Sequence, residues 1–145
     1  KAQLQVACGM TLKEIGLEQN SISLKKCAIQ SRVTLAPGGG SQLDVYILPA
    51  GAVSFEQGNA IRVDGLGYPG LKPSMQYDPL LGKLIVSSPL GSADAFEATR
   101  ALAVKALEEF RVEGINTNKN ILTGILNHQD FVHGAIFTTW LEAHL

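Results

Sequence analysis

One stretch of the chain places an arginine where it could meet an anion. Residues 27–35 alternate in character, so a strand there puts Ile29 and Val33 on one face and Arg32 on the opposite, more polar face. A guanidinium stays charged and offers a planar fork of donors that suits a planar anion. Arg32 is therefore a candidate catalytic or ligand-binding residue. The alternative is a strand arginine paired with an exposed carboxylate, a common arrangement worth only about 0–1 kcal/mol.

Further candidates lie in and around a long loop rich in glycine and proline, residues 65–79. Asp78 could act as a general base, although its position between Tyr77 and Pro79 suits an Asx turn into the next strand equally well. We expect the substrate-binding side chains to come from this loop, from the face of Arg32 and from the strand that follows the loop: Tyr68, Tyr77, Gln30 and Lys83.

Other chemistry-bearing residue types form only weak motifs. The glycine-rich residues 37–41 could cradle a phosphate, but no Gly-Lys-Ser or Gly-Lys-Thr follows and no helix is expected there, which favours a flexible loop. Cys8 and Cys27 have neither metal-ligand nor disulfide-scaffold spacing, so reduced apolar roles are expected. The three histidines have no ligand spacing on one helix and no neighbouring cysteine, so we expect surface or capping roles and no metal site: His128, His133 and His144.

The elements that must position these residues can be read from hydrophobic periodicity. Apolar side chains that recur every three or four residues predict a long helix over 95–110, started by Asp94 or Ser92. The first two predicted strands, 27–35 and 45–48, are expected to pair antiparallel. The order of strands, long helix, strand and short helices predicts an α+β fold, an antiparallel sheet with helices packed on it, as one domain over 1–145. The remaining expected strands are 60–64, 82–88 and 111–115, with short helices over 120–126 and 138–144.

The bulk composition excludes several classes of function. Lysine and arginine total 12 against 13 acidic residues, with no basic run, so nucleic-acid binding has no electrostatic footprint. The apolar runs are far shorter than the roughly 20 residues that a membrane-spanning helix needs, so we expect no membrane contact and a cytoplasmic protein. A helix already in progress at Lys1, without an initiator methionine, favours a domain boundary just upstream.

Two long segments resemble the carboxy-terminal domain of biotin carboxylases: Tyr77 to Val86 (YDPLLGKLIV) and Ala106 to Asn118 (ALEEFRVEGINTN). Shorter matches follow the family's order along nearly the whole chain: Val6-Ala7, Gly9 with Thr11-Leu12, and residues 28–33, 61–64, 130–131 and 139–142. The family comprises parts of acetyl-CoA, propionyl-CoA, pyruvate and urea carboxylases. A complete unit joins an amino-terminal lobe, an ATP-grasp lobe and this carboxy-terminal lobe, and only the last is matched here.

The resemblance implies roles for three of the candidate residues. Arg32 falls on the family's catalytic arginine, which holds bicarbonate and stabilises negative charge on the ureido oxygen of biotin. Asp78 falls on an acidic position near the biotin site, and Arg62 falls on an arginine at a dimer contact. The ATP, magnesium and general-base residues belong to the ATP-grasp lobe. The resemblance therefore implies no cofactor bound by this chain alone, and biotin and ATP-Mg only when the missing lobes complete it.

The sequence departs from the family directly after Arg32. An acidic pair and a proline-containing stretch usually follow the arginine, whereas this chain continues from Val33 to Gly38 without an acidic residue. Three hypotheses stay open. The first is a fragment of a biotin-dependent carboxylase, inactive alone, that contributes Arg32 and Asp78 to the biotin side of the site. The second is a free-standing repurposed enzyme that uses the cleft for an ATP-independent isomerase, lyase or cyclase reaction on a small-molecule ligand. The third is a non-catalytic module that uses the surface around Arg62 to form a homodimer or to bind a carboxylase subunit.

Overall fold

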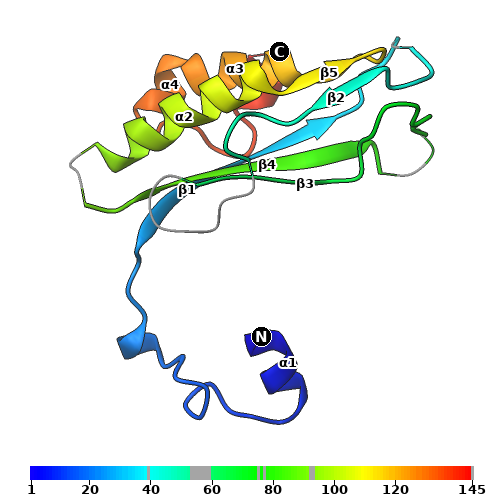
Figure 1. Cartoon of the computed structure of the whole chain (residues 1–145). Coiled ribbons are helices and arrows are strands. Elements are labelled where there is room, and N and C mark those ends of the chain that lie inside the picture. Colours follow the sequence, from blue (N-terminus) through cyan, green and yellow to red (C-terminus); the bar gives the residue numbers. More distant parts are fainter. Residues whose placement is uncertain (39, 53–59, 75, 77, 92–93, 145) are drawn as a thin grey trace.

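The chain folds into a body of strands and helices with a separate amino-terminal arm (Figure 1). The computed structural model describes residues 1–38, 40–52, 60–74, 76, 78–91 and 94–144. The body holds a three-stranded sheet and a two-stranded sheet, both antiparallel. This confirms the predicted α+β class. Within the described part, no helix is long and apolar enough to cross a bilayer.

The larger sheet has the order β1-β4-β3. Its central strand β4 (Leu80–Pro89) pairs with β1 (Lys26–Thr34) on one side and with β3 (Ala60–Gly65) on the other. One face is apolar and forms the core, where Val33 and Leu84 are fully buried. The alternation predicted for residues 27–35 is confirmed, because Ser31 and Val33 are buried while their neighbours at even positions are exposed or half-buried.

Helix α2 (Ala95–Glu109) covers the apolar face of this sheet (Figure 1). Its small and aliphatic side chains Ala103 and Leu107 are almost fully buried against the strands, and Phe110 closes the core at its end. Thr99 is also fully buried and satisfies its hydroxyl by donating to the carbonyl of Ala95 at 2.7 Å. The three-to-four-residue periodicity therefore located the helix correctly.

The start of α2 differs from the sequence-based expectation. Asp94 occupies the N-cap position, but its carboxylate makes no capping hydrogen bond, and Ser92 lies outside the described residues. Glu97 in the first turn binds the guanidinium of Arg100 through both carboxylate oxygens, at 2.7 and 2.6 Å. This pair lowers the pKa of Glu97, and a carboxylate there still complements the positive end of the helix dipole.

The pairing expected between residues 27–35 and 45–48 is wrong. Strand β2 (Val45–Ile47) pairs instead with β5 (Arg111–Glu113), which follows α2 in the chain. The physical reason is strand length: the nine residues of β1 match the ten residues of β4, whereas β2 has only three. Tyr46 fixes the smaller sheet to the core through an edge contact with the Phe110 ring, with the centroids 5.2 Å apart.

The carboxy-terminal elements are short and follow β5. Helix α3 (Lys119–Asn127) lies beside α2, and α4 (Gln129–Val132) begins directly after it. Residues 128–130 thus form the start of a helix. The helix expected over 138–144 is reduced to the 3-10 turn η2 (Leu141–Ala143).

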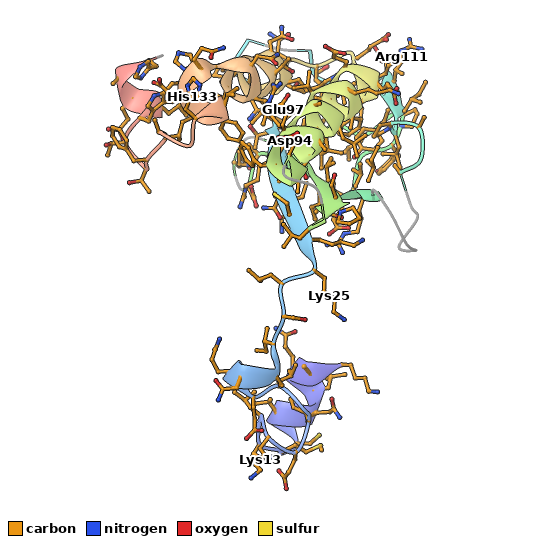
Figure 2. The ribbon with its side chains drawn as sticks, turned by 90° about the vertical axis from the view of Figure 1, so that its left-hand side faces the viewer. Lys13, Lys25, Asp94, Glu97, Arg111 and His133 are labelled. Atoms are coloured by element: carbon orange, nitrogen blue, oxygen red, sulfur yellow. The ribbon has the colours of Figure 1, made fainter. Side chains whose placement is uncertain are left out.

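The amino-terminal arm comprises α1 (Ala2–Ala7), a 3-10 turn η1 (Gln19–Ser21) and their connections. Figure 2 shows it standing away from the body, with Lys13 in the arm and Lys25 on the extended connection. Thr11 and Glu14 form a capping box: the Glu14 carboxylate accepts from the Thr11 amide at 2.8 Å, and Thr11 Oγ1 accepts from the Glu14 amide at 3.3 Å. It closes a turn over residues 12–16.

Candidate functional site

The face of the larger sheet opposite α2 brings four candidate residues together. Antiparallel register aligns Arg32 with Lys83 on the central strand, and Lys83 with Asp64 on the far strand. The next row of the same face aligns Gln30 and Arg62 across the central strand. Residues aligned in this way point to the same side of a sheet. Among the described residues, the helices of the body lie on the other side of this sheet (Figure 1), and we call the side of Arg32 the open face.

Arg32 lies at the end of the open face, within 3.8 Å of the Asp78 carboxylate. Both side chains stay more than half exposed, at 55% and 63%, so their attraction is weakened by water and contributes about 0–1 kcal/mol. The pair matches the arrangement that competed with a ligand role, a strand arginine beside an exposed carboxylate. It also leaves the guanidinium accessible to an anion from solvent.

An irregularity in β4 brings Asp78 to Arg32. Pairing of β1 with β4 shifts by one residue at its end, where Val33 lies opposite Gly82 but Thr34 lies opposite Leu80. The extra residue, Leu81, turns into a second apolar cluster and is almost fully buried. Asp78 then accepts a hydrogen bond from the Leu80 amide at 3.0 Å, which is the Asx turn expected from the sequence.

Asn118 holds the end of β1 and was missed by sequence reasoning as a site residue. Its side-chain amide donates to the Arg32 carbonyl at 3.0 Å, and its side-chain oxygen accepts from the Thr34 amide at 2.9 Å. The two bonds bracket Arg32 and fix the backbone from which its side chain extends. The signal available in the sequence was its place at the end of the segment 106–118, but nothing there showed what it contacts.

Arg62 binds Asp64 on its own strand, with 2.6 Å between Nη2 and Oδ2. The side chains of both residues are between two-fifths and one-half exposed. The pair leaves the open face with the cations of Arg32, Lys83 and Arg62 against the carboxylates of Asp64 and Asp78. Arg32 and Lys83 are like charges directly opposite each other, an arrangement that an anion stabilises.

The two candidate tyrosines are not joined to this group by the structure. Tyr68 lies in the loop after β3 and is 58% exposed, and among the described residues it forms no hydrogen bond with Arg32 or Asp78. Tyr77 lies outside the described residues. The ligand roles expected for both therefore stay predictions.

The glycine-rich loop after β1 does not have the form of a phosphate cradle. Among its described residues, Pro37 and Gly38 form a turn and no helix begins there. Beside it lies a small cavity of about 120 Å³, lined by Leu35, Ala36, Pro37, Gly38, Gly40, Pro73, Ile115 and Asn116. A cavity of this size is too small for a nucleotide or another ligand of drug-like size.

Comparison with known proteins identifies relatives of the whole chain. Residues 49–143 match the family model described as the biotin carboxylase C-terminal domain. A pyruvate carboxylase of Aspergillus niger is 36% identical over 149 aligned residues, which cover 97% of this chain and 11% of that protein. The chain thus spans about a tenth of the length of this relative.

Solved structures share the fold. The biotin carboxylase domain of a single-chain bacterial carboxylase aligns with a TM-score of 0.79 at 35% identity, covering 99% of this chain and 31% of that one. The biotin carboxylase domain of the Hydrogenobacter thermophilus 2-oxoglutarate carboxylase aligns with a TM-score of 0.77 at 28% identity, covering 98% of this chain and 29% of that one. The latter was solved as a dimer with MgADP, ADP and bicarbonate.

Proposed function

The chain belongs to the family of biotin carboxylase C-terminal domains, and on this basis we propose that it is the carboxy-terminal lobe of a biotin-dependent carboxylase. In this role it supplies the open face, with Arg32 as the residue that meets the substrate anion. The observation that supports the proposal most directly is the position of Arg32. Its side chain is exposed beside Asp78, and the Asn118 side chain fixes the backbone on both sides of it.

Arg32 suits the chemistry because its charge does not depend on pH and its donors form a planar fork. When biotin is bound, it supplies the ureido nitrogen that accepts the carboxyl group. Arg32 then holds bicarbonate and offsets the negative charge that develops on the ureido oxygen. Asp78 orients the guanidinium from 3.8 Å away, while Lys83 and Gln30 are the neighbouring contacts on the same face.

The amino-terminal arm supports a role within a larger enzyme. Several apolar side chains of this arm are exposed, and Leu24 is 85% exposed on the connection to β1. A group of exposed apolar side chains is typical of a surface that another part of a protein covers. The exposed large apolar residues of the arm are Leu4, Val6, Met10, Leu12, Leu17, Ile22 and Leu24. We infer that the arm packs on the ATP-grasp lobe of the complete carboxylase.

The cofactors divide between the lobes. The chain on its own contributes the biotin and bicarbonate side, and ATP-Mg binds only when an ATP-grasp lobe completes the enzyme.

We also propose that Arg62 lies at a homodimer contact, since it sits on the open face and the Hydrogenobacter relative was solved as a dimer. Neither nucleic acid nor membrane is a proposed partner, and the proposed location is the cytoplasm. The relatives described above are carboxylases or their domains, and none favours the alternative of an isomerase, lyase or cyclase.

A domain exchange tests the proposal. Residues 1–145 replace the matching lobe in the biotin carboxylase domain of the bacterial single-chain carboxylase, and ATP hydrolysis is measured with bicarbonate, with and without free biotin. We expect the chimera to show ATP hydrolysis that biotin stimulates. A folded chimera that binds ATP but gives no response to biotin contradicts the proposal. The chain alone is expected to bind no ATP, and a micromolar ATP site in calorimetry contradicts this assignment of ligands.

A further inference from the structure

The end of the chain folds back on the corner between α3 and α4. His128 stands at that corner and caps α4, accepting a hydrogen bond from the Asp130 amide at 3.1 Å. After α4, Gly134 adopts a positive φ of 69° that reverses the chain direction. Trp140 is then buried beside the corner. Its position brings His144 next to His128 and Asp130, although His144 shares no helix or strand with them.

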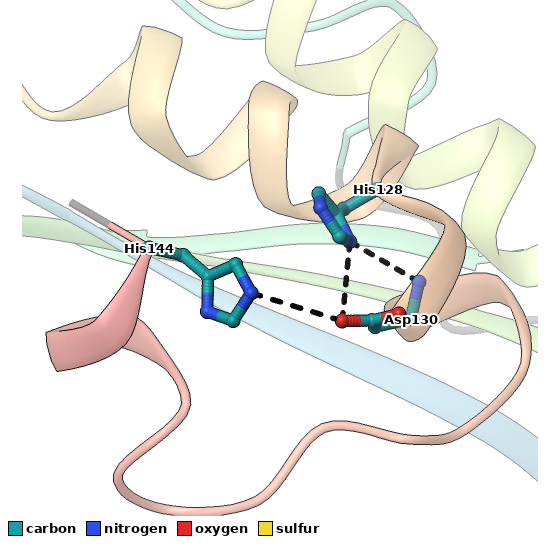
Figure 3. A group of neighbouring side chains, drawn as sticks. All are labelled: His128, Asp130 and His144. Carbon is teal, nitrogen blue, oxygen red and sulfur yellow. Dashed lines mark hydrogen bonds and ion pairs between the residues drawn. The ribbon is translucent and has the colours of Figure 1, made fainter.

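Two histidines and a carboxylate meet there (Figure 3). The Asp130 carboxylate lies between the rings, with Oδ2 3.7 Å from His128 Nδ1 and 4.0 Å from His144 Nε2. All three atoms lie within 4.8 Å of one another. Around a metal ion at about 2.0–2.1 Å from each ligand, such atoms are roughly 3.3–3.6 Å apart. Small side-chain movements therefore suffice to close the site.

The surrounding hydrogen bonds orient these atoms as metal ligands require. The Trp140 indole donates to Asp130 Oδ2 at 2.8 Å. The Trp140 carbonyl lies 2.8 Å from His144 Nδ1 and can only accept, so this nitrogen carries the proton and Nε2 directs a lone pair toward Asp130. A backbone carbonyl on the second ring nitrogen is a frequent partner of metal-binding histidines.

In His128 the lone pair on Nδ1 already accepts a hydrogen bond. Its Nδ1 accepts from the Asp130 amide, which places the ring proton on Nε2. We propose that His128 Nδ1, Asp130 Oδ2 and His144 Nε2 bind a divalent first-row transition metal ion, with Zn²⁺ as the ion that suits two imidazoles and a carboxylate. Binding exchanges the hydrogen bond from the Asp130 amide for a bond from Nδ1 to the metal.

This proposal replaces the expectation from sequence that the histidines form no metal site. That expectation rested on the absence of ligand spacing along one helix, whereas the site is assembled by the turn after α4. A pocket of about 280 Å³ adjoins it, lined by Ile121, Gly124, Ile125, His128, Trp140, Leu141 and His144. Both histidines line this pocket, which has room for a fourth ligand such as water or a small anion. In the proposal the metal fastens the last turn of the chain to α4.

Ring packing offers another explanation of the same contacts. Trp140 stacks on His144 with the centroids 4.1 Å apart, and His128 meets Trp140 edge-on at 4.8 Å. An aromatic cluster of this kind needs no metal. The two explanations differ in what Zn²⁺ does to the protein, and His133 provides a control because it is exposed, lies at the end of α4 and belongs to neither arrangement (Figure 2).

The test is calorimetric titration of the tag-free, metal-free chain with Zn²⁺ at pH 7.5, alongside thermal unfolding with and without Zn²⁺. We expect one Zn²⁺ per chain, a higher melting temperature with Zn²⁺, and no response to Mg²⁺, which prefers sites built from oxygen ligands. His144→Gln and Asp130→Asn should weaken binding at least tenfold and lose the thermal shift, while His133→Gln keeps both.

Two results overturn the proposal. One is the absence of a Zn²⁺ site in the folded wild-type chain, which leaves the aromatic cluster as the full explanation. The other is binding that is lowered as much by His133→Gln as by His144→Gln. Circular dichroism of each variant without metal shows whether it is folded. Asp130→Asn keeps an oxygen for the Trp140 indole, so a folded variant is available even if His144→Gln disturbs the packing.

Discussion

Replacing Asn118 by alanine removes the two side-chain bonds that hold the end of β1. The bonds are 2.9 and 3.0 Å long and reach Thr34 and Arg32. Each contributes about 0.5–1.5 kcal/mol net, and a half-buried amide left without a partner adds to the loss. We therefore expect Asn118→Ala to lower the free energy of unfolding by about 2 kcal/mol. For a chain of this size that corresponds to a fall in melting temperature of about 6 °C.

The geometry separates this effect from helix capping. Asn118 is the N-cap residue of α3 but makes no side-chain cap bond. Its backbone amide donates to the Thr34 carbonyl at 3.2 Å, and the substitution does not remove this donor. Asn120→Ala is the matched control, since Asn120 is exposed in the first turn of the same helix. Alanine there improves helix propensity, so its stability should be unchanged or slightly higher.

The assay is urea unfolding of the wild type and both variants, followed by amide hydrogen exchange. The Thr34 amide should exchange faster in Asn118→Ala, because its partner is the Asn118 side chain. A loss of less than about 0.5 kcal/mol, within the range of ordinary surface substitutions, with unchanged exchange at Thr34, would refute the role assigned to Asn118.

Two other substitutions test buried polar groups in the core. The Ser88 hydroxyl is buried and has no hydrogen-bond partner among the described residues. Ser88→Ala should therefore raise the free energy of unfolding by about 1 kcal/mol and the melting temperature by about 3 °C. Ser87→Ala on the open face should change little, and a destabilised Ser88→Ala contradicts the prediction. Burial raises the pKa of Tyr46 above its ordinary value of 10.0. A raised folded-state pKa contributes stability that is lost as the pH rises above 10.0. The free energy of unfolding should therefore fall more steeply above this pH in the wild type than in Tyr46→Phe. Equal slopes in urea unfolding at these pH values speak against it.

The parts of the fold set by local periodicity could be predicted from the sequence. Polar and apolar side chains alternate with a period of two along β1, which placed Arg32 and Gln30 on its polar face. Apolar side chains that recur every three or four residues located α2. Both periods follow from backbone geometry. The partner of a strand is not a local property. Strand β2 joined β5 because the short strand packs Tyr46 on Phe110, a contact between distant segments.

The candidate site shows the same division. The Asx turn of Asp78 involves neighbouring residues and was predictable. The two side-chain hydrogen bonds of Asn118 instead reach Thr34 and Arg32, which precede it in the sequence by 84 and 86 positions. The group of His128, Asp130 and His144 depends on the chain reversal at Gly134 and on the burial of Trp140. The spacing of residues along the sequence predicts neither the Asn118 hydrogen bonds nor the group of two histidines and a carboxylate, because only the folded chain brings these atoms together.

The central claim, that Arg32 serves biotin-dependent carboxylation, is tested most directly by kcat for biotin-stimulated ATP hydrolysis in the chimera described above. Arg111→Ala is the matched control, because Arg111 is also a strand arginine, more than half exposed and paired with a carboxylate, Glu113. Arg32→Ala should lower kcat on the order of 10²–10³-fold, as loss of a charge-stabilising donor does, with stability within about 1 kcal/mol of the wild type. Equal activity in the two folded variants would contradict the claim.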